Sequence, residues 1–170
     1  ENVRKMIADA NTVALISCMG TANNQRIMRL VDEAQIPYVA PQSGAVSLRK
    51  AEYRSVFHVR ASYSDEAQRL TQKLVSMGIT DLAIVYQDTA FGREFLADAT
   101  AALKATGKAV APKGFKLDAE GTQVAAVVAQ AVAAKPMAVL LGTAGDVTAL
   151  LVNEFKNVSR STPLADRKSV

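Results

Sequence analysis

The chain has 170 residues, 49% of them hydrophobic and 5% aromatic, which is enough apolar material for one substantial core or for two small lobes built on separate sheets. The formal charge is +4, but the basic residues are scattered among Asp and Glu without a basic stripe interleaved with aromatics, so we expect no nucleic-acid partner. A single cysteine, Cys18, excludes an internal disulfide and a multi-cysteine metal site, and with His58 as the only histidine zinc would need unusual ligands.

The first part of the chain alternates helical and extended patterns. Apolar residues recur at helical spacing or gather in short continuous runs, which are typical of buried parallel strands. The expected elements are a helix at 1–10, a strand at 12–18, a helix at 21–34, a strand at 36–40, a loop leading into a short helix at 41–48, and a strand at 55–59. The segment from 12 to 40 is therefore one βαβ unit.

After the third strand the pattern restarts. Ser64 is expected to cap a helix running to Met77, because Asp65 and Glu66 are favourable in a first turn and Gly78 is a stop signal. The elements expected next are a strand at 81–86, a polar loop at 87–92, a helix at 93–105, an extended segment at 109–115 interrupted by Pro112, a helix at 122–134, a strand at 137–141 and a helix at 146–156.

This alternation predicts an α/β fold with parallel sheets flanked by helices. No sequence repeat and no low-complexity linker divides the chain. The best candidate for a boundary is the polar junction 60–63, which joins two sets of βα units, each with three expected strands.

Ligands of open parallel sheets bind at the carboxyl ends of the strands, where helix N-termini present unpaired N–H donors. In the first such loop, Gly20 lets the backbone turn closely and Thr21 offers a hydroxyl and an N–H to a carboxylate, although ordinary helix capping explains the pair equally well. The second loop supplies Ser43 with the amides of Gly44 and Ala45, and a plain surface turn is its alternative.

Two further loops carry candidate ligand contacts. Asp88 can accept a hydrogen bond from an ammonium group and Phe91 can close over the apolar part of a ligand, but a lone acid after a strand is more often a helix cap. Gly142 and Thr143 begin a turn that resembles a fragment of a nucleotide-binding loop, without the full G-x-G-x-x-G pattern or its acidic partner.

Catalytic motifs are absent from the sequence. It contains no G-x-S-x-G elbow, no P-loop and no H-E-x-x-H motif, and His58 falls in the third expected strand, where a structural role is favoured over a catalytic one. The adjacent acids at 32–33 and 65–66 point in different directions on their helices and fit solvated faces. We therefore expect no enzyme, no cofactor and no metal site.

Three phrases taken together are more informative than any one of them: PQSGAVSLR at 41–49, VFHVRASY at 56–63 and VYQDTAFG at 85–92. In this order they resemble the type I periplasmic binding proteins, above all the branched-chain amino-acid (Leu/Ile/Val)-binding group of ABC transporter receptors. The resemblance runs from about Asn2 to Phe155.

The resemblance implies a receptor of two Rossmann-like lobes that close by a hinge motion on a ligand held in the cleft between them. By position, Gly20 and Thr21 match the turn that holds the ligand carboxylate, and the Ser43 turn matches the second such turn. Phe91 stands where many members of the family have Tyr, and Asp88 is a candidate for the acid that binds the ammonium group.

By the same resemblance, residues 1–59 are part of lobe one, 60–156 are most of lobe two, and 157–170 are a tail or return segment, so the receptor is incompletely represented. The implied function is that of a monomeric, periplasmic or membrane-tethered extracytoplasmic receptor that delivers an amino acid or similar small carboxylate to a membrane ABC permease. Two alternatives stay open: a ligand-sensing domain of a receptor or transcriptional regulator, and a Rossmann-like enzyme.

Overall fold

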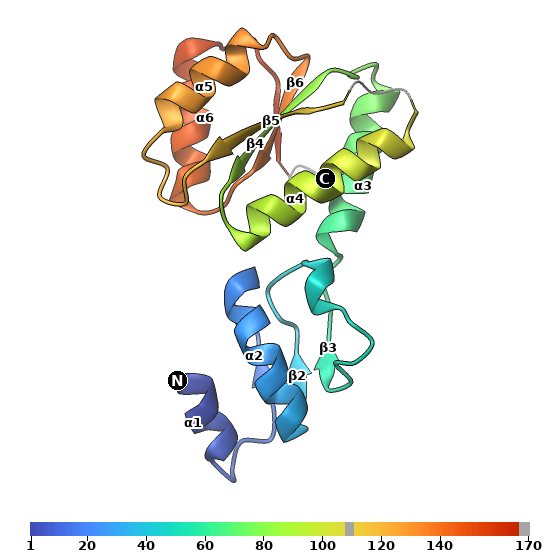
Figure 1. Ribbon diagram of the computed structural model, residues 1–170, viewed down its shortest axis with the longest axis vertical. Helices are drawn as coiled ribbons and strands as arrows, with labels where there is room; N and C mark the ends of the chain where they lie inside the picture. Colours follow the sequence, from blue (N-terminus) through green and yellow to red (C-terminus); the bar gives the residue numbers. More distant parts are fainter. Residues whose placement is uncertain (108–110, 167–170) are drawn as a thin grey trace. The chain divides into compact units, whose positions relative to one another are not determined.

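The computed structural model describes residues 1–107 and 111–166, with the side chain of residue 166 left aside. The chain divides into two compact units, Glu1–Ser62 and Tyr63–Val170, and Figure 1 draws their elements. Each unit has its own parallel sheet. The α/β class expected from the sequence is confirmed, with helices flanking parallel strands.

The first unit is a small sheet with the strand order β1-β2-β3. Its elements are α1 (Asn2–Ala8), β1 (Leu15–Ile16), α2 (Thr21–Ala34), β2 (Tyr38–Val39), the 3-10 helix η1 (Val46–Leu48) and β3 (Val56–Phe57). Because side chains alternate along a strand, Leu15 and Tyr38 lie opposite each other on one face of the sheet. Both are buried, as are Met28 and Val31 of α2.

The second unit is a sheet of order β5-β4-β6-β7 with helices on both faces. Its elements are α3 (Tyr63–Ser76), β4 (Leu82–Gln87), α4 (Ala90–Ala105), β5 (Lys113–Leu117), α5 (Val124–Ala133), β6 (Ala138–Gly142), α6 (Asp146–Val158) and β7 (Leu164–Asp166). All of its strand pairs are parallel.

Two hydrophobic clusters, one on each face, hold this second sheet between its helices. Leu82 and Ile84 of β4 pack with the buried residues of α3 and α4, whereas Ala83 and Val85 pack with those of α5 and α6. A strand covered on both faces needs apolar residues at every position, and this explains the continuous apolar runs in the sequence. Figure 1 shows the same arrangement, with α5 and α6 across the sheet from α3 and α4.

The structure corrects several expected boundaries. Helix α4 begins at Ala90 instead of 93, because the hydroxyl of Thr89 caps it by accepting from the N–H of Gly92. Ser64 lies inside the first turn of α3 and is not its cap. His58 follows β3 instead of lying within it. Of the extended segment expected at 109–115, the first two residues lie outside the described part, and the strand runs from 113 to 117.

A seventh strand forms in the segment that was expected to be a tail or return segment. β7 pairs in parallel with β6, with Leu164 opposite Val139. It is a three-residue strand that follows the polar stretch 159–162 and Pro163, so its own sequence shows no apolar alternation. The neighbouring strand therefore decides its conformation.

Candidate functional site

In the first unit, the structure brings the two predicted carboxylate-binding turns together. Met19 after β1 and Gln42 after β2 form an isolated parallel bridge, so the loops leave the sheet side by side. The Oγ1 atom of Thr21 lies 2.9 Å from the Oγ atom of Ser43, and both side chains are buried. The contact between these two hydroxyls thus connects two turns that are separated by about twenty residues of helix and strand.

Gly20 leaves the start of α2 without a side-chain cap. It is the N-cap residue and its φ is 91°, in a region that side chains other than glycine rarely adopt. A glycine cap has no side chain to occupy the N–H groups of the first turn, which carry the positive end of the helix dipole. In the second turn, the N–H of Ala45 donates to the Ser43 hydroxyl over 3.3 Å, with Gly44 buried between them. Amides and hydroxyls of this kind suit a carboxylate.

Asn24 holds these loops in place and was not predicted from the sequence. Its amide nitrogen donates to the carbonyl of Cys18 over 2.9 Å and to that of Gly20 over 2.7 Å, and its oxygen accepts from the hydroxyl of Tyr38. Burial raises the pKa of Tyr38, so its hydroxyl remains a donor at all physiological pH values. Only the fold reveals this role, because an Asn in the first turn of a helix is usually solvated.

Gln87 performs the corresponding role in the second unit and was also missed. It ends β4, is buried, and its Nε2 donates to the carbonyl of Ala119 over 2.9 Å. Its Oε1 accepts from the N–H of Ala144 over 2.8 Å. One side chain thus connects the loops that follow β5 and β6. Gln87 itself ends β4, the neighbour of β6, and the helices that follow these two strands, α4 and α6, lie on opposite faces of the sheet; the ends of β4 and β6 are therefore a topological switch point, where open α/β sheets bind ligands.

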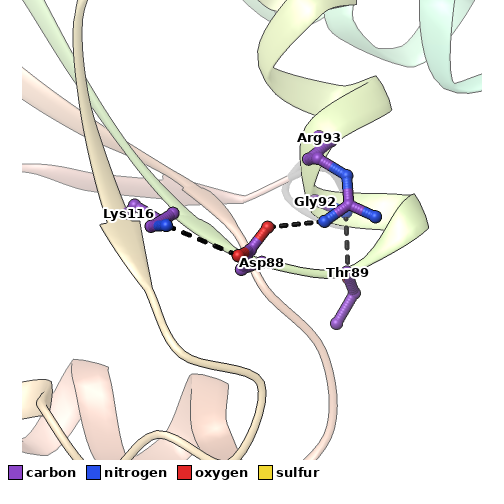
Figure 2. A network of polar contacts seen from close by, with 5 residues as sticks. All are labelled: Asp88, Thr89, Gly92, Arg93 and Lys116. Atoms are coloured by element: carbon purple, nitrogen blue, oxygen red, sulfur yellow. Dashed lines mark hydrogen bonds and ion pairs between the residues drawn. The ribbon is translucent and has the colours of Figure 1, made fainter.

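Asp88 is the centre of a charged network (Figure 2). Its Oδ1 accepts from Nη1 of Arg93 over 2.5 Å, and its Oδ2 lies 3.5 Å from Nζ of Lys116. The hydrogen bond from Arg93 holds the pKa of Asp88 below its usual range, and the charge of Lys116 acts in the same direction. The carboxylate expected to face an ammonium group is therefore already bound by two cations of this chain. The capping role considered for Asp88 belongs to Thr89.

Phe91 lies in the first turn of α4 and packs against aromatic neighbours of its own unit. Its ring centroid is 5.0 Å from that of Tyr63, edge to face, and 6.1 Å from that of Phe95. Phe95 also approaches Gly142 so closely that a Cβ at Gly142 would lie 2.6 Å from its ring. Glycine is required there by this close approach.

Thr143 is buried next to Gly142, and its Oγ1 lies 2.9 Å from that of Thr148 in α6. The hydroxyl therefore bonds across the start of the helix that follows its loop. The structure brings Asp88, Phe91, Gly142 and Thr143 to the carboxyl end of the second sheet, and it groups Gly20, Thr21, Ser43, Gly44 and Ala45 at that of the first.

His58 bonds within the first unit. Its Nε2 is 3.1 Å from the carbonyl of Leu48, so this nitrogen carries the proton. Burial and then the charge of Arg49 lower its pKa. Within residues 1–107 and 111–166, no group of three or more His, Cys, Asp and Glu residues could hold a metal ion. No helix in the same residues is both long and apolar enough to cross a membrane.

Comparison with known proteins identifies solved structures that match nearly the whole length of the chain. A structure of a substrate-binding periplasmic protein from Ralstonia solanacearum matches 97% of the chain at 30% identity with a TM-score of 0.86, and the match covers 46% of that protein. An extracellular ligand-binding receptor from Verminephrobacter eiseniae matches 91% of the chain at 28% identity with a TM-score of 0.84, over 44% of its own length. The chain thus spans less than half of these relatives.

A third structure, a branched chain amino acid ABC transporter protein from Thermus thermophilus with bound valine, covers 97% of the chain with a TM-score of 0.84. The match covers 43% of that protein, and its sequence identity of 17% shows a common fold. A search of curated proteins found no significant match. The family model described as periplasmic binding protein matches residues 1–161, nearly the full length, and this chain therefore belongs to the periplasmic binding protein family.

Proposed function

We propose that this protein is an extracytoplasmic solute-binding receptor that captures an amino acid or a similar small carboxylate and delivers it to a membrane ABC permease. The observation that carries the proposal is the joining of two turns in the first unit through the Thr21 and Ser43 hydroxyls, beside a helix start capped by glycine. A carboxylate bound there receives N–H and O–H donors from two loops and the positive end of a helix dipole.

The relatives support this choice of ligand class. The Thermus thermophilus protein holds valine, and a substrate-binding protein from Desulfitobacterium hafniense with a TM-score of 0.80 is in complex with Leu. Both ligands carry a carboxylate. For this chain, Gly20 and Thr21 together with the Ser43 turn are the proposed carboxylate contacts, and Phe91 and Thr143 are the proposed contacts of the second unit, with Asp88 and Gly142 beside them.

The proposal assigns residues 1–59 to part of lobe one and 60–156 to most of lobe two of such a receptor, acting as a monomer in the periplasm. Membership of the family supports the assignment of the chain to a receptor of this kind.

Isothermal titration calorimetry of the full-length protein against amino acids and small aliphatic and aromatic carboxylates tests the function. We expect one class of carboxylate to bind, and Thr21→Val to weaken its binding by about tenfold or more, because the substitution removes one hydroxyl of the pair, so that Ser43 keeps the N–H of Ala45 but loses the Thr21 hydroxyl.

A matched control comes from Thr71, whose buried hydroxyl donates to the carbonyl of Ala67 inside α3. Thr71→Val removes an equally buried hydroxyl far from any proposed contact in the sequence, and it should leave the affinity as it is. A folded protein that binds nothing in the panel contradicts the proposal, as does equal weakening by the two variants.

A further inference from the structure

The charged network around Asp88 bears on which carboxylates the receptor takes, an inference that rests on the proposed function. Asp88 contributes one negative charge, and Arg93 and Lys116 contribute two positive charges within 2.5 and 3.5 Å of it. The network is therefore positive overall. Its two cationic side chains are 60% and 63% exposed, and Figure 2 shows them on either side of Asp88.

The position of the network makes this charge relevant to a ligand. Asp88 follows β4, Lys116 is the penultimate residue of β5, and Arg93 lies in the first turns of α4. All three are at the carboxyl end of the sheet, and the proposed contact Phe91 lies in the same first turns of α4 as Arg93. The N-terminus of α4 adds the positive end of its dipole at the same place. A ligand ammonium brought here meets repulsion, whereas an uncharged or anionic group does not.

The next carboxylate along this edge is also occupied by its own chain. Asp118, which follows β5, accepts from the N–H groups of Glu120, Thr122 and Gln123 and from the hydroxyl of Thr122. These bonds hold the pKa of Asp118 below its usual range and bind both of its oxygens to the turn before α5. Asp146 opens α6, where the helix dipole already neutralises part of its charge.

We propose that the ligand of this receptor is a small carboxylate without a positively charged amino group, such as a 2-oxo acid or a simple aliphatic or aromatic carboxylate. A group of the ligand that reaches the carboxyl end of the second sheet meets the net positive charge of Asp88, Arg93 and Lys116. Selection against amino acids comes from Arg93 and Lys116, which bind Asp88 and leave no net negative charge for an ammonium group.

Calorimetry of the full-length protein with two matched pairs of probes tests this selection. The pairs are leucine with 4-methyl-2-oxopentanoate and phenylalanine with phenylpyruvate, in which only the α-amino group is replaced. We expect the oxo acid of at least one pair to bind about tenfold or more tightly than its amino acid. Tighter binding of the amino acids overturns this inference alone. If the oxo acids, the amino acids and the wider carboxylate panel all fail to bind the folded protein, the proposed function falls, and this inference with it.

A double variant, Arg93→Gln with Lys116→Gln, tests the cause. Freed from both cations, Asp88 presents a negative charge, so the preference for the oxo acid over the amino acid should fall by about tenfold. Both side chains are exposed, and circular dichroism is expected to show an intact fold. Arg29→Gln is the control, since it removes an even more exposed cation, whose partner is Glu33 on α2. An unchanged preference in the double variant contradicts the assigned role of these cations.

Discussion

The surroundings of Asp98 on α4 disfavour its ionised form, and its replacement by Asn should stabilise the protein at neutral pH. One of its carboxylate oxygens, Oδ2, is buried and has no hydrogen-bond partner among the described residues. Burial, and then the negative charge of Glu94 one turn earlier, raise the pKa of Asp98 from 3.8 to about 6. The flanking residues Phe95 and Ala99 are fully buried and fix the helix against the sheet.

The size and sign of the effect follow from this pKa. A rise from 3.8 to about 6 corresponds to about 3 kcal/mol of unfavourable free energy for the ionised form. Partial solvent screening reduces this to about 1–2 kcal/mol. Because the folded state prefers the protonated acid, the penalty is absent below pH 3.8, grows as the pH rises towards about 6, and is constant above that. Asp98→Asn removes the charge while keeping the shape of the side chain.

Urea unfolding followed by circular dichroism at pH 7.5 and pH 4.5 measures this prediction. We expect Asp98→Asn to raise the free energy of unfolding by about 1–2 kcal/mol at pH 7.5 and by clearly less at pH 4.5. Glu33→Gln, which removes an exposed carboxylate paired with Arg29, should change stability by less than about 0.5 kcal/mol at both values. A variant no more stable than the parent at pH 7.5, or a gain independent of pH, refutes the reasoning.

Three further substitutions test other parts of the structure. Gly92→Ala places a Cβ 2.0 Å from the carbonyl oxygen of Gln87 and should lower the free energy of unfolding in urea by about 3 kcal/mol. Gly78→Ala, which is strained only by its left-handed φ, should lower it by about 1 kcal/mol, and equal losses would contradict the clash. Gln87→Leu leaves two backbone groups without their partner and should lower stability by about 3 kcal/mol, and a loss below about 1 kcal/mol would contradict its bridging role. His58 has a folded-state pKa below 6.5, so the unfolded chain takes up the proton first and stability falls as the pH drops below about 6.5. In His58→Gln this part of the pH dependence of the free energy of unfolding should disappear, and its persistence would show that another group causes it.

Much of the fold could be predicted because helical and strand periodicities are local properties of the sequence. The helix expected at 21–34 has those bounds in the structure, and the apolar runs around 38, 57, 84 and 139 are strands. The predicted boundaries were wrong where a side-chain contact or a neighbouring strand determines the end of an element. The start of α4 depends on the hydroxyl of Thr89, and β7 exists because β6 offers it an edge.

The candidate site was predictable in its location but not in its chemistry. The loops at Gly20, Ser43 and Asp88 follow strands, and parallel topology alone places such loops at the carboxyl end of each sheet. The hydrogen bonds by which Asn24 and Gln87 hold the loops could not be predicted from the sequence. A polar residue gives the same sequence pattern whether its side chain is solvated or bonded to a distant carbonyl.

The sequence by itself determined the α/β class, the order of most of its elements and the likeness to periplasmic binding proteins, because these depend on periodicity and on short ordered phrases. Only the tertiary structure decided what the polar side chains of the site do. Thr21 meets Ser43 because β1 and β2 are neighbours, and Asp88 is bound by Lys116 because β4 and β5 are neighbours. Pairings between residues this far apart in the chain arise from strand order, which no local pattern encodes.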